Sequence, residues 1–280
     1  MGKIPFRRFL SLYGIYARMD LAWLLRDTKF ALLAIFSDMC ANLSSIAGVF
    51  LLAWRFDGLG GMSKYEVLLM LAYVNIITGI AQMYGGTNAL HISRIIGRGQ
   101  WEHMFIMPLP YGVQLTVGIF PFTSSSNLLS GITILCVAIH KLGLTLPWWW
   151  VLSLLFNVLL SLVIYICLSY LASTLAFYAP VQCEEISTYV LDWVGYIGRF
   201  PLSGMPRSLQ LPLLTFLPAG LLAWFPTLAL LGRPPLHLSA AFPLLLVIVL
   251  MFITAYCFKK GFNYYVQKGI NRYLSGGHRR

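Results

Sequence analysis

Five long apolar runs dominate this chain of 280 residues and constrain its fold more than any other feature. A run of about 20 apolar residues is long enough to cross the hydrocarbon core of a bilayer as a helix. Lipid offers no partner for backbone amides and carbonyls, so a crossing run forms its hydrogen bonds within itself. The sequence therefore predicts an all-α integral membrane protein. The five clear spans are residues 30–54, 67–85, 111–139, 148–177 and 240–258.

The composition excludes two other classes of protein. Hydrophobic residues make up 59% of the chain and charged residues only 10%, with a mean hydropathy of +0.76. Soluble domains carry about a quarter charged residues. The net charge of +11 would suit a nucleic-acid binder, but such a protein needs a solvated basic face. Almost every long segment here is compatible with lipid, so we expect no nucleic-acid partner.

The basic residues predict how the spans are oriented. Six Lys or Arg residues precede the first span and six follow the last, so the positive-inside rule places both termini in the cytoplasm. The number of crossings is then even, and the region 178–238 must supply an odd number. Asp192 and Arg199 weaken one candidate, and prolines break the apolar stretch after it. We take 185–200 as the fifth of six spans and 205–231 as a re-entrant outer segment.

The remaining segments follow from this orientation. Residues 1–29 are predicted to form an interfacial amphipathic helix in contact with membrane lipids, because Arg7, Arg18 and Lys29 recur every eleven residues. The opposite side of that helix carries Phe9, Leu12, Tyr16, Met19 and Trp23. The alternative is a basic leader that only fixes the topology. The loop 86–110 and the tail 259–280 are predicted to be cytoplasmic.

Ionisable side chains inside the spans are costly, so each is a candidate for function. Asp38 lies in the first span with Asn42 one turn further along, and the two could line a polar cavity or simply fix helix packing. Asp192 and Arg199 are two turns apart on one face of the fifth span, where they are candidates for a pathway or a dimer interface. Glu184 lies near the start of that span, where its negative charge is expected to interact favourably with the helix dipole.

No catalytic, metal-binding or cofactor-binding constellation is visible in the sequence. The five histidines are dispersed among loops and ends, and the five cysteines stand singly without metal-ligand spacing. The only Gly-Lys pair, Gly2-Lys3, lacks the upstream glycine of a phosphate-binding loop. We therefore expect no enzymatic site and no cofactor in this chain.

The order of these segments resembles the permease subunit of an ABC-2-type exporter, in a subfamily long filed under unknown function. Arg98-Gly99-Gln100-Trp101-Glu102, followed by Met107-Pro108-Leu109, looks like the pattern of that subfamily between the second and third spans. Met107 departs from it, since the family often has Arg there. Further similarities cover the outer segment and the tail, at 199–202, 214–218 and 268–273.

The resemblance implies that residues 1–280 form one transmembrane permease domain in a bacterial cytoplasmic membrane. It implies a pathway built by two permease subunits, identical or related, and driven by two separate ATPase subunits that bind ATP and Mg. It also implies that the loop 86–110 contains a coupling helix that sits in a groove on the ATPase. The residues expected to make this contact are Arg98, Gln100, Trp101, Glu102, His103 and Phe105.

Within that loop, Trp101 and Phe105 have the i,i+4 spacing of one apolar ridge, with polar residues at its side. The alternative is a surface loop whose Trp101 rests at the inner membrane interface. For the whole chain we expect an exporter of a hydrophobic or amphipathic substrate, such as a lipid, a peptide or a natural product. The rivals are an autonomous intramembrane or lipid-modifying enzyme and a secondary transporter, which would require internal repeats.

Overall fold

The computed structural model describes residues 6–109, 111–116, 122–233 and 241–269. Within these ranges the chain is helical, and apart from an isolated bridge between Leu59 and Met62 it forms no β-structure. The α-helices are α1 (Phe6–Arg26), α2 (Thr28–Arg55), α3 (Lys64–Ala81), α4 (Thr87–Gly97), α5 (Trp101–Ile106), α6 (Tyr111–Thr116), α7 (Ser125–Leu142), α8 (Trp148–Ser173), α9 (Pro180–Ile197), α10 (Arg207–Thr215), α11 (Trp224–Leu230) and α12 (Ala241–Lys268). Short helices of other types are the π-helix η1 (Gln82–Gly86) and the 3₁₀ turns η2 (Phe122–Ser124), η3 (Thr174–Phe177), η4 (Leu202–Gly204) and η5 (Ala219–Leu221).

Five stretches of the described chain are long and apolar enough to cross a membrane, which confirms the predicted all-helical membrane class. They are Thr28–Arg55, Lys64–Gly97, Ser125–Leu142, Trp148–Phe177 and Ala241–Lys268. A sixth candidate is the pair α10 and η5–α11, bent by 75°, which is either a broken span or a re-entrant loop. The predicted fifth span, 185–200, falls in α9, which is not among these stretches. Three carboxylates in α9 make it less apolar than the others.

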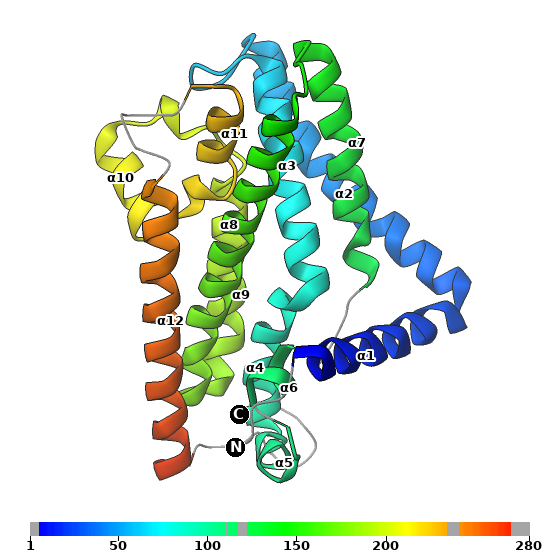
Figure 1. Cartoon of the computed structure of the whole chain (residues 1–280), viewed down its shortest axis with the longest axis vertical. Coiled ribbons are helices and arrows are strands. Elements are labelled where there is room, and N and C mark those ends of the chain that lie inside the picture. Colours follow the sequence, from blue (N-terminus) through cyan, green and yellow to red (C-terminus); the bar gives the residue numbers. More distant parts are fainter. Residues whose placement is uncertain (1–5, 110, 117–121, 234–240, 270–280) are drawn as a thin grey trace.

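Helix α1 lies across the axis of the bundle, at the end of the molecule that carries α5 and is called here the α5 end (Figure 1). Asp27 ends α1 and starts α2, because its side chain accepts a hydrogen bond from Phe30 N at 3.0 Å and caps α2. The ring of Tyr13 stacks on Tyr84 of η1 with 6.4 Å between centroids. Burial, together with Tyr84, raises the pKa of the Tyr13 hydroxyl to about 12. An uncharged aromatic contact therefore attaches α1 to the bundle.

The helix of the second predicted span continues well beyond residue 85. Helix α3 passes through the π-helix η1 into α4 and stays helical to Gly97, so the predicted loop 86–110 begins inside a helix. Helix α4 continues because Ile92 and Ile96 are buried on one side while Arg94 is exposed on the other. The loop was predicted to begin at residue 86, but in the structure it begins at Arg98.

The third predicted span, 111–139, is divided. Its first part is the short α6, and α7 begins only at Ser125 after the 3₁₀ turn η2. The residues 117–121 between α6 and η2 lie outside the described part. Within it, the 3₁₀ turn η2 leads directly into α7 at Ser125.

Helices α3 and α7 pack closely because each carries a glycine at the contact. A Cβ added at Gly131 would lie 2.9 Å from Ile76 N, and one added at Gly79 would lie 2.7 Å from Leu128 N. Both neighbours are backbone atoms, which cannot move aside as a flexible side chain can. Small residues at such positions let membrane helices approach until their backbones touch. Since α3 is the most buried of the spans, this contact fixes the centre of the bundle.

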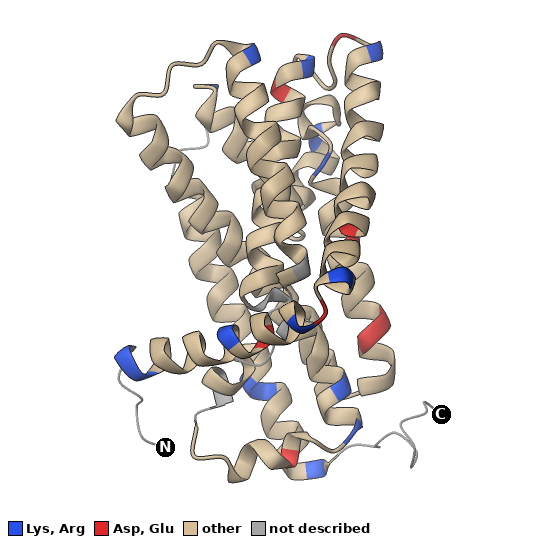
Figure 2. Cartoon of the chain, turned by 90° about the vertical axis from the view of Figure 1, so that its right-hand side faces the viewer, with Lys and Arg blue, Asp and Glu red and all other residues tan. Residues whose placement is uncertain are grey.

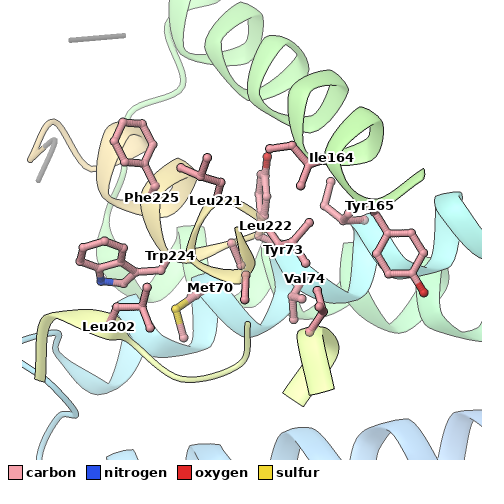
Figure 3. Close-up of a cluster of buried hydrophobic side chains, with 14 of the residues drawn as sticks. Met70, Tyr73, Val74, Ile164, Tyr165, Leu202, Leu221, Leu222, Trp224 and Phe225 are labelled. Atoms are coloured by element: carbon pink, nitrogen blue, oxygen red, sulfur yellow. The ribbon is translucent and has the colours of Figure 1, made fainter. Parts of the chain in front are cut away.

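The segment after α9 folds back as two short helices at the opposite end of the bundle, called here the α11 end (Figure 1). Buried side chains of this segment, including Leu202 and Trp224, pack against α3 and α8 (Figure 3). Ser161 Oγ donates to Leu221 O at 3.0 Å, and Trp150 Nε1 donates to Leu230 O at 3.1 Å. These bonds satisfy backbone groups that the broken helices leave free, as an apolar setting requires. Trp150 is buried against α11.

The last span was predicted to end at residue 258, but α12 continues for ten more residues. The first part of the predicted tail, 259–280, is therefore helical. The helix continues because Gly261 and Tyr265 are buried against other parts of the chain. A Cβ on Gly261 would lie 2.8 Å from the Phe177 ring, so only glycine lets this ring approach so closely. Figure 2 shows that most Lys, Arg, Asp and Glu residues lie toward the two ends of the bundle or on α1.

Candidate functional sites

The connection between α4 and α6 is the first candidate site, and Trp101 forms its base. Trp101 begins α5 and is 0% exposed. Its ring meets Phe177 edge-on with 5.5 Å between centroids and lies 6.4 Å from both Phe262 and Tyr265. Aromatic pairs in this range add about 0.5–1.5 kcal/mol to the free energy of burial. Rings from η3 and α12 therefore hold the first turn of α5 in place.

Two polar contacts attach the same region to α12 and α9. Tyr265 Oη donates a hydrogen bond to Glu102 Oε1 at 3.0 Å. Arg94 donates to Glu184 Oε1 from two nitrogens, Nε at 2.9 Å and Nη2 at 2.8 Å. Glu184 was expected near the start of its helix, but α9 begins at Pro180, so Glu184 lies in the second turn and pairs with α4. The two partners are 90 residues apart, and no local pattern in the sequence indicates that they meet.

The predicted apolar ridge of Trp101 and Phe105 is corrected by this geometry. Trp101 points into its own chain and is not accessible to a partner, while the Phe105 ring lies 6.1 Å from Phe262. The apolar surface that remains open comes from Phe105, Ile106 and Met107, called here the loop tip, of which Ile106 is 80% exposed. Sequence reasoning missed Ile106 and Met107. The available signal was that they lie just before Pro108, where a helix must end.

The polar residues predicted for this loop are distributed around the tip. Arg98, Gln100 and His103 are exposed, whereas Glu102 is half-buried against Tyr265. Gln100 and His103 face a groove of about 420 Å³ between α1 and the loop. The groove is otherwise mostly apolar, and its walls include Leu12, Tyr16, Ile95, Met104, Met107, Leu109 and Val113. Helix α1 and the loop thus form one continuous surface at the α5 end.

We expect Tyr265→Phe to lower the free energy of unfolding by about 1.5–3 kcal/mol, because the Glu102 carboxylate loses a charge-assisted hydrogen bond. The change leaves the ring in place, so the aromatic packing around Trp101 is preserved. The measurement is unfolding by SDS in mixed micelles. Tyr256→Phe is the matched control, since Tyr256 is on the same helix but exposed. Equal effects of the two changes would show that the hydrogen bond to Glu102 contributes nothing.

The second candidate site is an open pocket of about 300 Å³ between α2, α3, α8 and α9, called here the central polar cavity. It brings together three of the four predicted pathway residues: Asn42, Asp192 and Arg199. Asp38 does not line it, but its backbone carbonyl accepts a hydrogen bond from Asn42 Nδ2 at 2.9 Å. The cavity walls come from α2, α3, η1, α7, α8 and α9, and include Ser45, Thr78, Gln82, Asn127 and Tyr165.

Polar groups around the cavity bond to one another only in part. Arg199 donates a hydrogen bond to Ser45 Oγ on α2, and its guanidinium lies 5.7 Å from the centre of the Tyr196 ring. Asn127 Nδ2 donates to Gln82 Oε1 at 3.1 Å. Gln82 is the first residue of η1, and π-helical turns of this kind are often found at functional sites. Neither Asp192 nor Arg199 forms a salt bridge with another described residue.

Among the described residues, no three His, Cys, Asp or Glu side chains lie close enough to hold a metal ion. The polar groups that line the central polar cavity are amides, hydroxyls, the guanidinium of Arg199 and the carboxylate of Asp192. They offer hydrogen-bond donors and acceptors and charges of both signs.

Comparison with protein families gives one match, which covers most of the chain. The profile described as "ABC-2 family transporter protein" matches residues 39–269, from within α2 to the end of α12. Both candidate sites fall inside this range. No curated protein and no solved structure matches the chain.

Proposed function

The chain belongs to the ABC-2 family of transporter proteins, and from this premise we propose that it pairs with a second permease subunit to form an export pathway driven by two separate ATPase subunits. Family membership makes it the permease component of an ABC transporter, embedded in a membrane by several helices. The exporter role, the dimer and the contact with the ATPase are the proposal. ATP and Mg would be bound by the partner ATPase.

The exposed loop tip is the observation that supports coupling through the α4–α6 connection. An apolar tip on a short helix, surrounded by the exposed polar residues Arg98, Gln100 and His103, has the composition of a small protein interface. In the proposed complex, Ile106 and Met107 enter a groove on the ATPase. Trp101 and Glu102 take a different role from the one expected, since they hold the tip on the permease.

The base of the loop offers a route for movement into the bundle. A displacement of the tip would act through Trp101 on η3 and α12, and through Arg94 and Glu184 on α9. Helix α9 also carries Asp192, and the turn after it carries Arg199, at the central polar cavity. Coupling along this route would be measured as a coupling free energy between a change at the loop tip and a change at the central polar cavity.

The orientation and the cargo are part of the same proposal. The exposed basic residues of α1, together with Lys259 and Lys260 on α12, lie at the α5 end, which supports placing this end in the cytoplasm. The α5 end is also where an ATPase has to bind. The bent pair of α10 and α11 would then enter the outer leaflet and return. The cargo we propose is a hydrophobic or amphipathic molecule.

The test is purification of the tagged full chain from its native membrane, with the co-purified ATPase identified by mass spectrometry. We expect Ile106→Asp to weaken that complex by at least about tenfold, because a carboxylate would be buried without a partner at the centre of the contact. Val266→Asp is the matched control, since Val266 is exposed near the end of α12. An intact complex with Ile106→Asp would remove the loop tip from the interface. Full activity of the isolated chain without nucleotide would overturn the proposal and favour an autonomous membrane enzyme.

A further inference from the structure

Two atoms at the central polar cavity have no hydrogen-bond partner within the described residues. One is Asn127 Oδ1, an acceptor on a residue that is only 6% exposed, and the other is Arg199 Nε, a donor. A buried polar atom without a partner is unfavourable, so such atoms are nearly always satisfied by other protein groups, by water or by a ligand. Asn127 and Arg199 both line the cavity, so each contributes one polar atom that no described residue satisfies.

The charges of the cavity are also separated. Arg199 and Asp192 both line it, seven residues apart, with Asp192 in α9 and Arg199 in the turn just after its end. They do not form a salt bridge, and no described cation pairs with Asp192. The cavity thus has a positive part and a negative part. An anion alone would complement the first and be repelled by the second.

The size of the cavity and its surroundings narrow the choice of ligand further. A volume of about 300 Å³ is at the lower end of the range for small-molecule sites and many times the volume of one water molecule. Beside the cavity, α9 exposes three aromatic rings at helical spacing, those of Tyr189, Trp193 and Tyr196. This exposed aromatic face continues from the polar walls, since Tyr196 belongs to both. A molecule with a polar head and an apolar chain would complement the two surfaces at once.

We propose that the central polar cavity binds the headgroup of a zwitterionic amphiphile. Its anionic group would accept hydrogen bonds from Arg199, and its ammonium would lie toward Asp192 and donate to Asn127 Oδ1. The apolar chain would extend along the aromatic face of α9. This inference rests on the proposed function in one respect only, which is that the bound amphiphile would be cargo. Binding itself is measured on the full chain without an ATPase.

The test compares two lysolipids with the same acyl chain, lysophosphatidylethanolamine and lysophosphatidic acid, titrated into the purified full chain and followed by native mass spectrometry. We expect the zwitterion to bind at least tenfold more tightly than the anion. Asp192→Asn should remove most of this preference, because the ammonium loses its counter-charge and the anion loses a repulsion. Arg199→Gln should weaken both lysolipids at least tenfold, whereas Arg199→Lys should retain most of the binding.

Arg207→Gln is the matched control, because Arg207 is exposed at the start of α10 and does not line the cavity. Glycerophosphoethanolamine, which has the zwitterionic phosphodiester headgroup without the acyl chain, should bind at least tenfold more weakly than the lysolipid. If the lysolipid and the chain-free headgroup bound equally well, the ligand would be a soluble zwitterion and not an amphiphile. Equal affinity of the wild type for both lysolipids, or unchanged binding by Arg199→Gln, would overturn the proposal and leave a cavity filled with water. None of these results depends on an ATPase, so the proposed function can fail or hold separately.

Discussion

Trp101→Ala is expected to lower the free energy of unfolding by about 3–5 kcal/mol, the cost of removing a large aromatic side chain from a packed site. Trp101 is fully buried among Phe177, Phe262 and Tyr265, which come from η3 and α12. Truncation would leave a cavity where three parts of the chain meet, and α5 is too short to keep its place alone. The measurement is SDS-induced unfolding in mixed micelles.

Trp148→Ala supplies the control for this change. Trp148 is 78% exposed at the start of α8, at the end of the bundle opposite α5, so its removal should cost little by comparison. For the transport complex, Trp101→Ala should leave Ile106 exposed but no longer fixed, so ATP hydrolysis would continue while transport falls. A variant as stable as the wild type would show that the aromatic cluster does not hold the loop. Transport at the wild-type rate would show that a fixed tip is not needed.

Much of the fold follows from patterns that are local in the sequence. Runs of apolar residues predicted α2 and α8 with small errors at their ends, and the start of α12, because each residue in such a run contributes to the free energy of entering lipid as a helix. The eleven-residue repeat of basic residues predicted α1 in the same way. Helix ends were predicted less well where buried contacts extend a helix past its apolar run, as Tyr265 does in α12.

Positions of polar residues were predicted more often than their roles. Asp192 and Arg199 are ionisable residues of a predicted span and line one cavity. Asn42 lines it too, but Asp38, one turn away, does not. Whether Trp101 faced a partner or its own chain depended on Phe177 and on α12, which lie far from it in sequence. The pair of Arg94 and Glu184 was missed for the same reason. A periodic pattern locates the face of a helix, but it does not identify what that face meets.

The second large effect on stability is expected from a substitution at the glycines in the contact of α3 and α7. We expect Gly131→Val to destabilise the protein by about 3 kcal/mol, the upper part of the range for overpacking, because its Cβ alone would lie 2.9 Å from Ile76 N. The neighbouring atom is backbone in the most buried span, so the two helices must separate to make room. The free energy of unfolding in mixed micelles is again the measured quantity.

Gly48→Val is the matched control, since Gly48 lies within α2 and a Cβ there meets no other atom within 4 Å. Both changes replace glycine by valine inside a long helix, so intrinsic helix propensity alters equally and only the contact differs. Separation of α3 from α7 would also move Asn127 away from Gln82, whose side chains are 3.1 Å apart and line the central polar cavity. Gly131→Val should therefore weaken lysolipid binding as well as stability, whereas Gly48→Val should change neither. If the two variants were equally stable, close approach of these helices would not be what holds the cavity together.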